Sequence, residues 1–290
     1  MIQLKMHLSL SLVFIIISSS GIYCQESEEK SDLGKEEKIL ESYFDSLATV
    51  RGDKEKERYN QKIIHKFRYL LAQEQTFHYP FDSIQQAGIL FSSDNRVKIY
   101  NWNLPYDGGY HKYFCFIQYK KGKKDPIKLF ELTDQSDKIK NPEDKTLKPD
   151  NWYGALYYRI ITIEGRDHQR YYTLLGYDPN DFLTNKKVID VLYFKKGTNP
   201  AFGAPIFKNR KVTQRRIIFE YSEFASMTLK YDEGKEMIIY DHLSPSEPKY
   251  EGQYEFYGPD FSYDGLKYEN GIWNTYFDLD PRLNKIELNN

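Results

Sequence analysis

The chain has little cysteine and almost no net charge. Only 2 of its 290 residues are cysteine, and 41 lysines and arginines are balanced by 42 aspartates and glutamates, for a formal net charge of -1. A nucleic-acid binder needs a surplus of cations to displace counterions from phosphates, so the charge balance argues against that class. A scaffold held by several disulfides is also excluded, because two cysteines allow at most one bridge.

Long apolar runs are lacking as well. A short cationic head is followed by ten mainly apolar residues, Leu8–Ile17, and then by the small residues Ser18–Gly21. Ten residues are too few to cross a hydrocarbon layer of roughly 30 Å as a helix. This order of segments is typical of an export signal. We therefore expect residues 1–21 to be a signal peptide, removed on export to the periplasm, the outer-membrane surface or the extracellular space. No transmembrane span is expected in the mature chain.

The two cysteines, Cys24 and Cys115, are not expected to form a structural bridge. Cleavage after Gly21 satisfies the small-residue rule better than cleavage after Cys24, and the sequence leaves open whether Cys24 is retained. If it is lost, Cys115 has no partner. Large apolar neighbours surround Cys115 in the segment Tyr113–Ile117. Since reactive thiols lie in electropositive, partly exposed places, we expect a buried, unreactive thiol.

Residues 22–34 form a charged leader, and residues 35–75 carry helical periodicity in two blocks. Gly52 is a natural stop between the blocks, and Asp53 is placed to cap the second helix. The sequence predicts a helical hairpin whose apolar stripe packs on the rest of the protein. The stripe residues are Ile39, Leu40, Tyr43, Phe44 and Leu47 in the first helix (35–50), and Tyr59, Ile63, Ile64, Phe67, Leu70 and Leu71 in the second (54–75).

From about Gly88 the apolar period changes to two, which predicts strands. Short strands without intervening helices favour antiparallel pairing, and Asn270-Gly271 predicts a tight hairpin. We expect residues 76–290 to be one mainly β domain, an antiparallel meander arranged as a barrel, sandwich or propeller-like stack around a single interior. The predicted strands are 96–103, 112–119, 127–132, 153–163, 169–177, 188–194, 215–221, 227–231, 237–241, 254–257 and 273–279.

Residues 133–150 contain few apolar side chains, two prolines and many charges. A loop of this length is uncommon in a compact domain. It is either a functional flap or a solvated excursion from the surface, and its low aromatic content favours the excursion.

The signatures of common catalytic and cofactor sites are absent. The sequence has no Gly-x-Ser-x-Gly elbow, no His-Glu-x-x-His, no P-loop, no Gly-x-Gly-x-x-Gly and no Cys-x-x-Cys. Asp178–Asp181 resembles the opening of a calcium loop but has no glutamate at the twelfth position, so an Asp-Pro turn explains it better. No two histidines have ligand spacing, and we expect neither a metal nor a cofactor.

Two short segments contain the catalytic candidates. Asp241 and His242 end a predicted strand and would make an acid–base pair at a sheet rim, although adjacent strand residues point to opposite faces. Asp260 and Asp264 lie among aromatic residues. They would act as a glycosidase-like carboxylate pair, or would accept hydrogen bonds from their own backbone in consecutive turns.

Aromatic residues supply the candidate ligand contacts. The chain has 26 tyrosines, and exposed aromatic rings stack on sugars or peptides. We single out Trp102, Trp152, Tyr257 and Tyr263 as candidates. AT-rich codons account for many tyrosines as well, and tryptophan in β proteins most often packs in the core.

Several short strings follow one another in a fixed order. They are Tyr100-Asn-Trp102, Gly108-Gly109, Ile117-Gln-Tyr119, Trp152-Tyr-Gly-Ala-Leu-Tyr-Tyr158, Tyr171-Tyr-Thr-Leu-Leu-Gly-Tyr-Asp178, Phe202-Gly-Ala-Pro-Ile-Phe207, Arg215-Arg-Ile-Ile-Phe-Glu-Tyr-Ser222, Asp241-His-Leu243 and Tyr257-Gly-Pro-Asp-Phe261. In this order, over roughly residues 88–280, the chain resembles a family of uncharacterised exported proteins from Bacteroidetes. The resemblance implies export and a single β-rich unit, and it transfers no catalytic residue because no activity is assigned to that family.

These observations lead to one main expectation and two alternatives. We expect an exported, non-catalytic binding or structural module with a glycan or protein ligand. The first alternative is a secreted hydrolase that acts on glycan or peptide through a carboxylate pair. The second is a subunit that docks through its helical hairpin, which requires an exposed apolar stripe. The ligand and the oligomeric state stay open.

Overall fold

The computed structural model describes residues 19–166, 168–209 and 212–280, with side chains from residue 32 onward. Most of the predicted signal peptide, residues 1–18, therefore lies outside the described residues. Within them the chain forms two α-helices, fifteen strands and six short 3-10 helices. No helix in this part of the chain is both long enough and apolar enough to cross a membrane.

The N-terminal helices form the predicted hairpin, with different ends. Helix α1 (Ser19–Thr49) begins well before residue 35, because the charged leader is rich in Glu and Lys, which favour helix. Helix α2 (Asp53–Leu71) follows Gly52, whose φ of 79° turns the chain. The predicted cap is wrong: Asp53 is the first helical residue, and its carboxylate accepts a hydrogen bond from the backbone N–H of Asp107 at 2.9 Å.

The first sheet covers the apolar stripe of this hairpin. It contains β1 (Gly88–Phe91), β2 (Val97–Pro105), β3 (His111–Tyr119) and β4 (Lys128–Thr133), all antiparallel and in chain order. The ring of Phe67 from α2 stacks on Trp102 of β2 at 5.2 Å. Because Leu40, Phe44 and Phe67 are buried here, the hairpin does not leave the apolar stripe that docking to another subunit requires.

The central sheet packs on the opposite face of the first sheet. Its strand order is β11-β7-β6-β5, with β8 paired to β7. Residues Val188 and Leu192 of β7 pack toward the first sheet, whereas Ile189 and Val191 pack the other way. The strands are β5 (Leu156–Glu164), β6 (Arg170–Asp178), β7 (Thr184–Lys195), β8 (Asn199–Phe202) and β11 (Ile217–Ser222).

The outer sheet completes the stack. Its order is β10-β9-β15-β14-β13-β12, and only the β15–β9 pair is parallel. Asn270 and Gly271 have positive φ and form the predicted hairpin turn between β14 and β15. The strands are β9 (Phe207–Asn209), β10 (Val212–Gln214), β12 (Leu229–Asp232), β13 (Met237–Pro245), β14 (Tyr257–Glu269) and β15 (Ile272–Tyr276).

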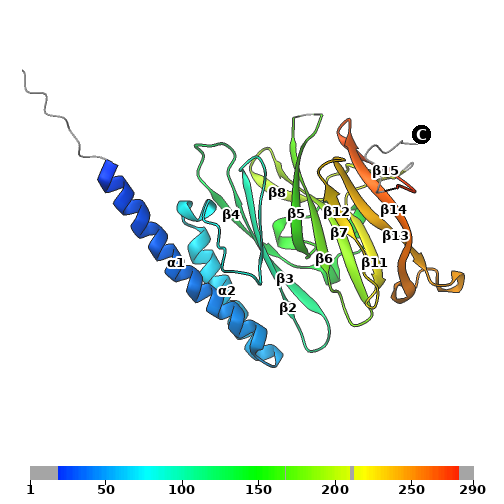
Figure 1. Cartoon of the computed structure of the whole chain (residues 1–290), viewed down its shortest axis with the longest axis horizontal. Helices are drawn as coiled ribbons and strands as arrows, with labels where there is room; N and C mark the ends of the chain where they lie inside the picture. The colour runs from blue at the N-terminus through cyan, green and yellow to red at the C-terminus, as the bar shows by residue number, and fades with distance from the viewer. Residues whose placement is uncertain (1–18, 167, 210–211, 281–290) are drawn as a thin grey trace, which may run out of the picture.

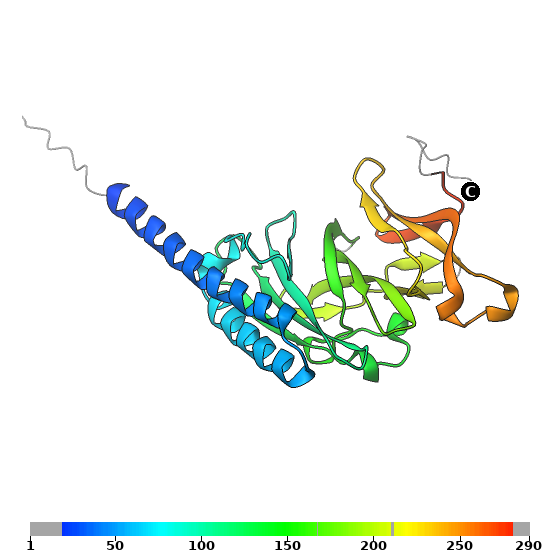
Figure 2. The ribbon, with the colours of Figure 1, turned by 60° about the horizontal axis from the view of Figure 1, so that its bottom comes forward.

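The molecule is therefore an elongated stack of four layers: helices, first sheet, central sheet and outer sheet (Figures 1 and 2). The mainly β, antiparallel fold with an N-terminal helical hairpin is confirmed, and there is no closed barrel among the described strands. The expected single interior is wrong. Separate apolar layers lie between the helices and the first sheet, between the first and central sheets, and between the central and outer sheets.

Two local predictions also need correction. In the segment 254–257, only Tyr257 belongs to a strand, as the first residue of β14. Tyr254–Phe256 forms a 3-10 helix, where the ring of Phe256 stacks on Tyr250 at 4.0 Å, and this helix lies against β11. Conversely, the region around Asp260 lies inside the long strand β14 and not in consecutive turns, but the predicted hydrogen bond to nearby backbone is present, because Asp260 accepts from the backbone N–H of Ser262 at 3.1 Å.

Residues 133–150 are tied to the body instead of extending into solvent. Leu147 is buried and exchanges backbone hydrogen bonds with Phe202 at 2.9 and 3.0 Å. The backbone N–H of Arg215 donates to the carbonyl of Glu143 at 2.8 Å. Three short 3-10 helices, Ser136–Lys138, Pro142–Asp144 and Pro149–Asn151, shape this stretch of the chain, and residues 134–138 form one wall of the cavity described below.

Candidate functional site

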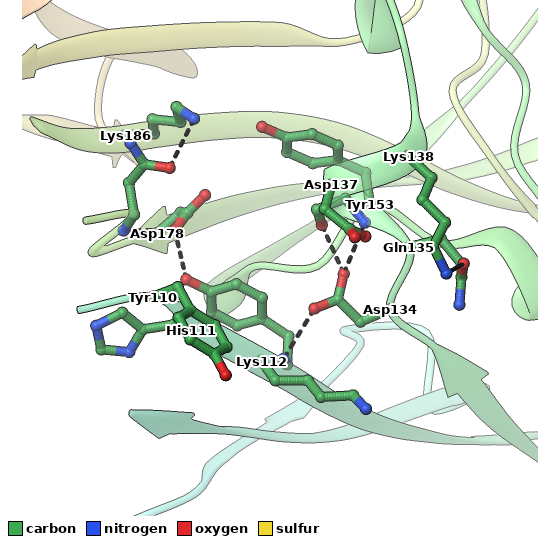
Figure 3. A pocket seen from close by; sticks show the side chains of 13 residues that line it. Tyr110, His111, Lys112, Asp134, Gln135, Asp137, Lys138, Tyr153, Asp178 and Lys186 are labelled. Carbon is green, nitrogen blue, oxygen red and sulfur yellow. Dashed lines mark hydrogen bonds between the residues drawn. The ribbon is translucent and has the colours of Figure 1, made fainter. Parts of the chain in front are cut away.

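A cavity of about 470 Å³ opens at one end of the layer between the first and central sheets (Figure 3). We call it the Asp178 cavity. The start of β3, the end of β6, the start of β7 and the 133–150 segment converge there. Its lining consists of Tyr110, His111, Lys112, Tyr113, Asp134, Gln135, Ser136, Asp137, Lys138, Tyr153, Asp178, Asn180 and Lys186.

Asp178 is the buried carboxylate of this cavity. Its Oδ1 accepts hydrogen bonds from the hydroxyl of Tyr113 and, at 2.6 Å, from the backbone N–H of Asn180. Figure 3 shows the other carboxylate oxygen of Asp178 directed toward the side of the cavity where Lys186 lies. Burial raises the pKa of Asp178 above its ordinary value, and the Tyr113 hydrogen bond and the Lys186 charge oppose this shift.

Asp134 is a rigid acceptor on the opposite side. Its two oxygens accept from the backbone N–H groups of Tyr113 and Ser136, both at 3.0 Å, and from the Ser136 hydroxyl at 2.6 Å. Gly154 allows this packing, because a Cβ there would lie 2.5 Å from the Tyr113 ring and 2.7 Å from Oδ1 of Asp134. The glycine is therefore required by close approach and not by an unusual φ.

The charged groups of the cavity balance. Three lysines (Lys112, Lys138 and Lys186) and three aspartates (Asp134, Asp137 and Asp178) line it. Lys186 Nζ donates to the side-chain oxygen of Asn180 at 2.8 Å. His111 adds little charge, since burial, aided by the nearby Lys56 ammonium, lowers its pKa and keeps the imidazole neutral at neutral pH.

Tyrosine rings supply the apolar part of the lining. Tyr110 is 54% exposed and stacks on Tyr106 with ring centroids 4.5 Å apart and planes only 10° apart, which fixes its orientation at the mouth. Tyr153 is buried deeper, and the guanidinium of Arg216 lies 5.6 Å from its ring centre. Burial raises the pKa of Tyr153, so its hydroxyl stays protonated and able to donate.

The carboxylate and histidine candidates from the sequence lie far along the stack, in the outer sheet. Asp241 and His242 do diverge, as adjacent strand residues should: Asp241 is buried and accepts from the backbone N–H of Thr228 at 2.6 Å. His242 instead pairs through Nδ1 with Asp264 at 2.8 Å, across a bulge between β13 and β14. Asp260 accepts from the backbone and hydroxyl of Ser262 at 3.1 and 2.7 Å.

The structure thus pairs His242 with Asp264, whereas the sequence suggested the pairs Asp241–His242 and Asp260–Asp264. The hydrogen bond from His242 to Asp264 raises the pKa of the imidazole, with smaller contributions from the charges of Asp260 and Asp278. The described residues contain no group of three or more His, Cys, Asp or Glu side chains suited to a metal ion.

The aromatic candidates are mainly core residues. Trp102 and Trp152 are 1% and 0% exposed, and their indole N–H groups donate to Asn60 and Tyr157 at 2.7 and 3.0 Å. Neither presents a ring face to a ligand. Tyr257 is half-buried and accepts from the backbone N–H of Gly252 at 2.9 Å, and Tyr263 packs on the outer sheet.

Cys115 is confirmed as a buried thiol. It lies in the layer between the first and central sheets, and burial raises the pKa of its thiol well above the ordinary value. The thiolate is therefore disfavoured, as expected for an unreactive cysteine.

None of the residues that line the Asp178 cavity is among the catalytic or ligand-contact candidates from the sequence. They come from stretches that are far apart in the sequence, and no catalytic or cofactor signature contains them. Two signals point to them in retrospect: the long polar segment 133–150, and the Asp-Pro turn that begins at Asp178. No protein-family model, curated protein or solved structure matches this chain. The function proposed below therefore depends on the geometry of the sites.

Proposed function

We propose that the protein is an exported, non-catalytic binding module that takes a neutral sugar unit of a glycan in the Asp178 cavity. The observation that carries this proposal is the combination, in one cavity of about 470 Å³, of tyrosine rings with a charge-balanced set of polar groups. Ligand pockets in proteins range from about 300 to 1,000 Å³, so the cavity has room for a sugar ring.

The lining matches the two surfaces of a sugar ring. The exposed ring of Tyr110 offers a flat apolar face at the mouth, which suits the C–H face of a pyranose. Deeper in, the free side of Asp178 and the ammonium of Lys186 offer an acceptor and donors for hydroxyl groups.

The charge balance favours a neutral ligand. Three lysines and three aspartates leave no net formal charge in the lining, so an ion gains no attraction from the cavity as a whole. A hydroxyl-rich ligand gains from both signs, since charged groups make stronger hydrogen bonds than neutral ones.

A non-catalytic role agrees with how Asp134 is held. Three donors engage its two oxygens, so the carboxylate is committed to holding the 133–150 segment instead of attacking a substrate or activating water. A carboxylate pair for glycoside hydrolysis needs a second group free to act as nucleophile or base, and Asp134 is not free to be that group.

One observation supports the alternative, a secreted hydrolase acting on a glycan. Burial raises the pKa of Asp178, and a carboxyl that stays protonated more easily is what a general acid requires. Asp178 is the residue through which that activity would operate.

Binding and turnover are tested together. We expect a glycan array to give neutral-sugar ligands, and Tyr110→Ala to weaken binding about tenfold through loss of the stacking ring. Tyr254→Ala is the matched control, because Tyr254 is also an exposed tyrosine packed on another tyrosine but lies in the 3-10 helix just before β14.

The outcomes separate the alternatives. Equal affinity in the Tyr110→Ala and Tyr254→Ala variants, or no glycan binding by the wild type, would contradict the proposal. Glycan cleavage that disappears in Asp178→Asn while binding persists would establish the hydrolase instead.

A further inference from the structure

A second cavity, of about 360 Å³, opens at the opposite end of the same layer. We call it the arginine cavity. The strands that begin or end at the Asp178 cavity pass the arginine cavity at their other ends: Tyr119 ends β3, Arg170 begins β6 and Phe194 lies near the end of β7. The lining also contains Arg96, Lys121, Glu164, His168, Gln169, Tyr172 and Gly197.

Aromatic rings form a rigid wall of this cavity. The rings of Tyr119 and Phe194 are stacked with planes 8° apart, and Tyr172 meets Phe194 edge-on with ring centroids 6.2 Å apart. All three residues are buried. The hydroxyl of Tyr172 donates to Asp94 at 3.0 Å, which further fixes the wall.

The cations differ in how they are paired. Arg170 lies 3.6 Å from Asp94, a carboxylate that also accepts from the hydroxyls of Tyr172 and Ser92. For Arg96, the backbone N–H donates to Ser92 and Asp94, whereas no hydrogen bond or ion pair within the described part of the chain engages its guanidinium.

Lys121 and Glu164 complete the charge distribution. The stem of Lys121 lies over Gly197, which has a φ of 67° and leaves room for it. Glu164 is 2.6 Å from Nδ1 of His168, so this carboxylate already has a partner at the rim. Near this cavity there are therefore three cations (Arg96, Lys121 and Arg170) and only two carboxylates, Glu164 in the lining and Asp94 beside Arg170. The lining of the Asp178 cavity, in contrast, has equal numbers of each.

We infer that the arginine cavity binds the phosphate or carboxylate group of a small ligand. An unpaired guanidinium beside two further cations suits an oxyanion, because its planar N–H groups can donate in pairs to two oxygens. This site is separate from the Asp178 cavity and does not depend on the function proposed there.

The test measures binding of inorganic phosphate and of glucuronate to the full chain by calorimetry, with glucose as the uncharged comparison. We expect at least one anion to bind, with an affinity that falls as NaCl is raised. Arg96→Gln should lower that affinity about tenfold or more, because it removes a charge-assisted pair of hydrogen bonds. The fold should not suffer, since no internal partner of the guanidinium is lost.

Arg159→Gln is the matched control. It removes the same charge from the central sheet, where Arg159 is ion-paired with Glu233 at the surface. The inference is overturned if neither anion binds, or if Arg96→Gln and Arg159→Gln bind it equally well. Binding of phosphate alone or glucuronate alone supports it and identifies the anion. Glucose binding that is unchanged in Arg96→Gln would be assigned to the Asp178 cavity and would not count for or against this inference.

Discussion

At the scale of single residues, the most demanding feature is an ion pair in the interior. Arg216 and Asp190 have fully buried side chains and form a bidentate pair, with Nε and Nη2 of the arginine at 2.8 and 3.0 Å from the two carboxylate oxygens. A third guanidinium nitrogen donates to the carbonyl of Pro142 at 2.6 Å, which ties the 133–150 segment to the central sheet.

Removing one partner of this pair should be costly. Arg216→Ala leaves the Asp190 carboxylate buried without its counter-ion, and we expect the free energy of unfolding to fall by roughly 3–5 kcal/mol in urea titrations. Arg68→Ala is the control, because Arg68 and Glu131 form an ion pair with both side chains more than 40% exposed. An exposed pair contributes about 1 kcal/mol or less. Similar losses in the two variants would refute this account of the buried pair.

At the scale of elements, the Asp178 cavity depends on the close approach of the chain just before β5 to β3. Gly154 lies directly against Tyr113 and Asp134, and its backbone N–H donates to the hydroxyl of Ser136 at 2.7 Å. The wall of the cavity is thus held to the sheets at a position where any side chain would collide with two lining residues.

Gly154→Ala should therefore open the cavity wall. The new methyl group would force Tyr113 or Asp134 to move, and we expect a loss of about 1–3 kcal/mol in the free energy of unfolding together with weaker glycan binding. In Gly258→Ala the new Cβ lies 3.5 Å from Ala225, an ordinary contact, so this control should be close to neutral. If urea titrations show both variants equally stable, the close-approach argument fails.

At the scale of the whole molecule, two titratable groups lie in different layers of the stack. Lys98 is buried between the helices and the first sheet, and its ammonium donates to the carbonyl of Tyr79. Burial lowers the pKa of Lys98 to about 8. His242 lies in the outer sheet, where the hydrogen bond to Asp264 raises its pKa.

The two groups should affect stability in opposite directions as pH rises. The stabilisation from His242 is complete below its unfolded pKa of about 6.5 and is lost as pH rises through its higher folded value. Lys98 opposes folding while it is charged in the interior, and this cost disappears between about pH 8 and its unfolded pKa of 10.5.

Urea titrations across this pH range test both effects. His242→Gln should flatten the decrease in unfolding free energy above about pH 6.5. Lys98→Met should flatten the increase between about pH 8 and 10.5, and below that range it should stabilise the protein by up to about 3 kcal/mol. A wild-type profile retained in either variant would show that the other groups of the protein account for that part of the curve.

Much of the local structure follows from the sequence alone. The stripe from Leu40 to Leu71 predicts two packed helices, the two-residue periodicity predicts most long strands, and Asn270-Gly271 predicts its hairpin. These features succeed because they depend on side chains a few residues apart, whose spacing on a helix or strand is set by backbone geometry.

The tertiary structure alone decided which faces meet. Apolar residues on both faces of β7 predict that both faces are buried, but they do not predict which sheet covers each face. The same holds for the sites, since Asp178 and Asp134, or His242 and Asp264, come together only through strand register and the stacking of layers. Such contacts cannot be predicted from the spacing of residues within one helix or strand, because they arise from packing between elements that are far apart in the sequence.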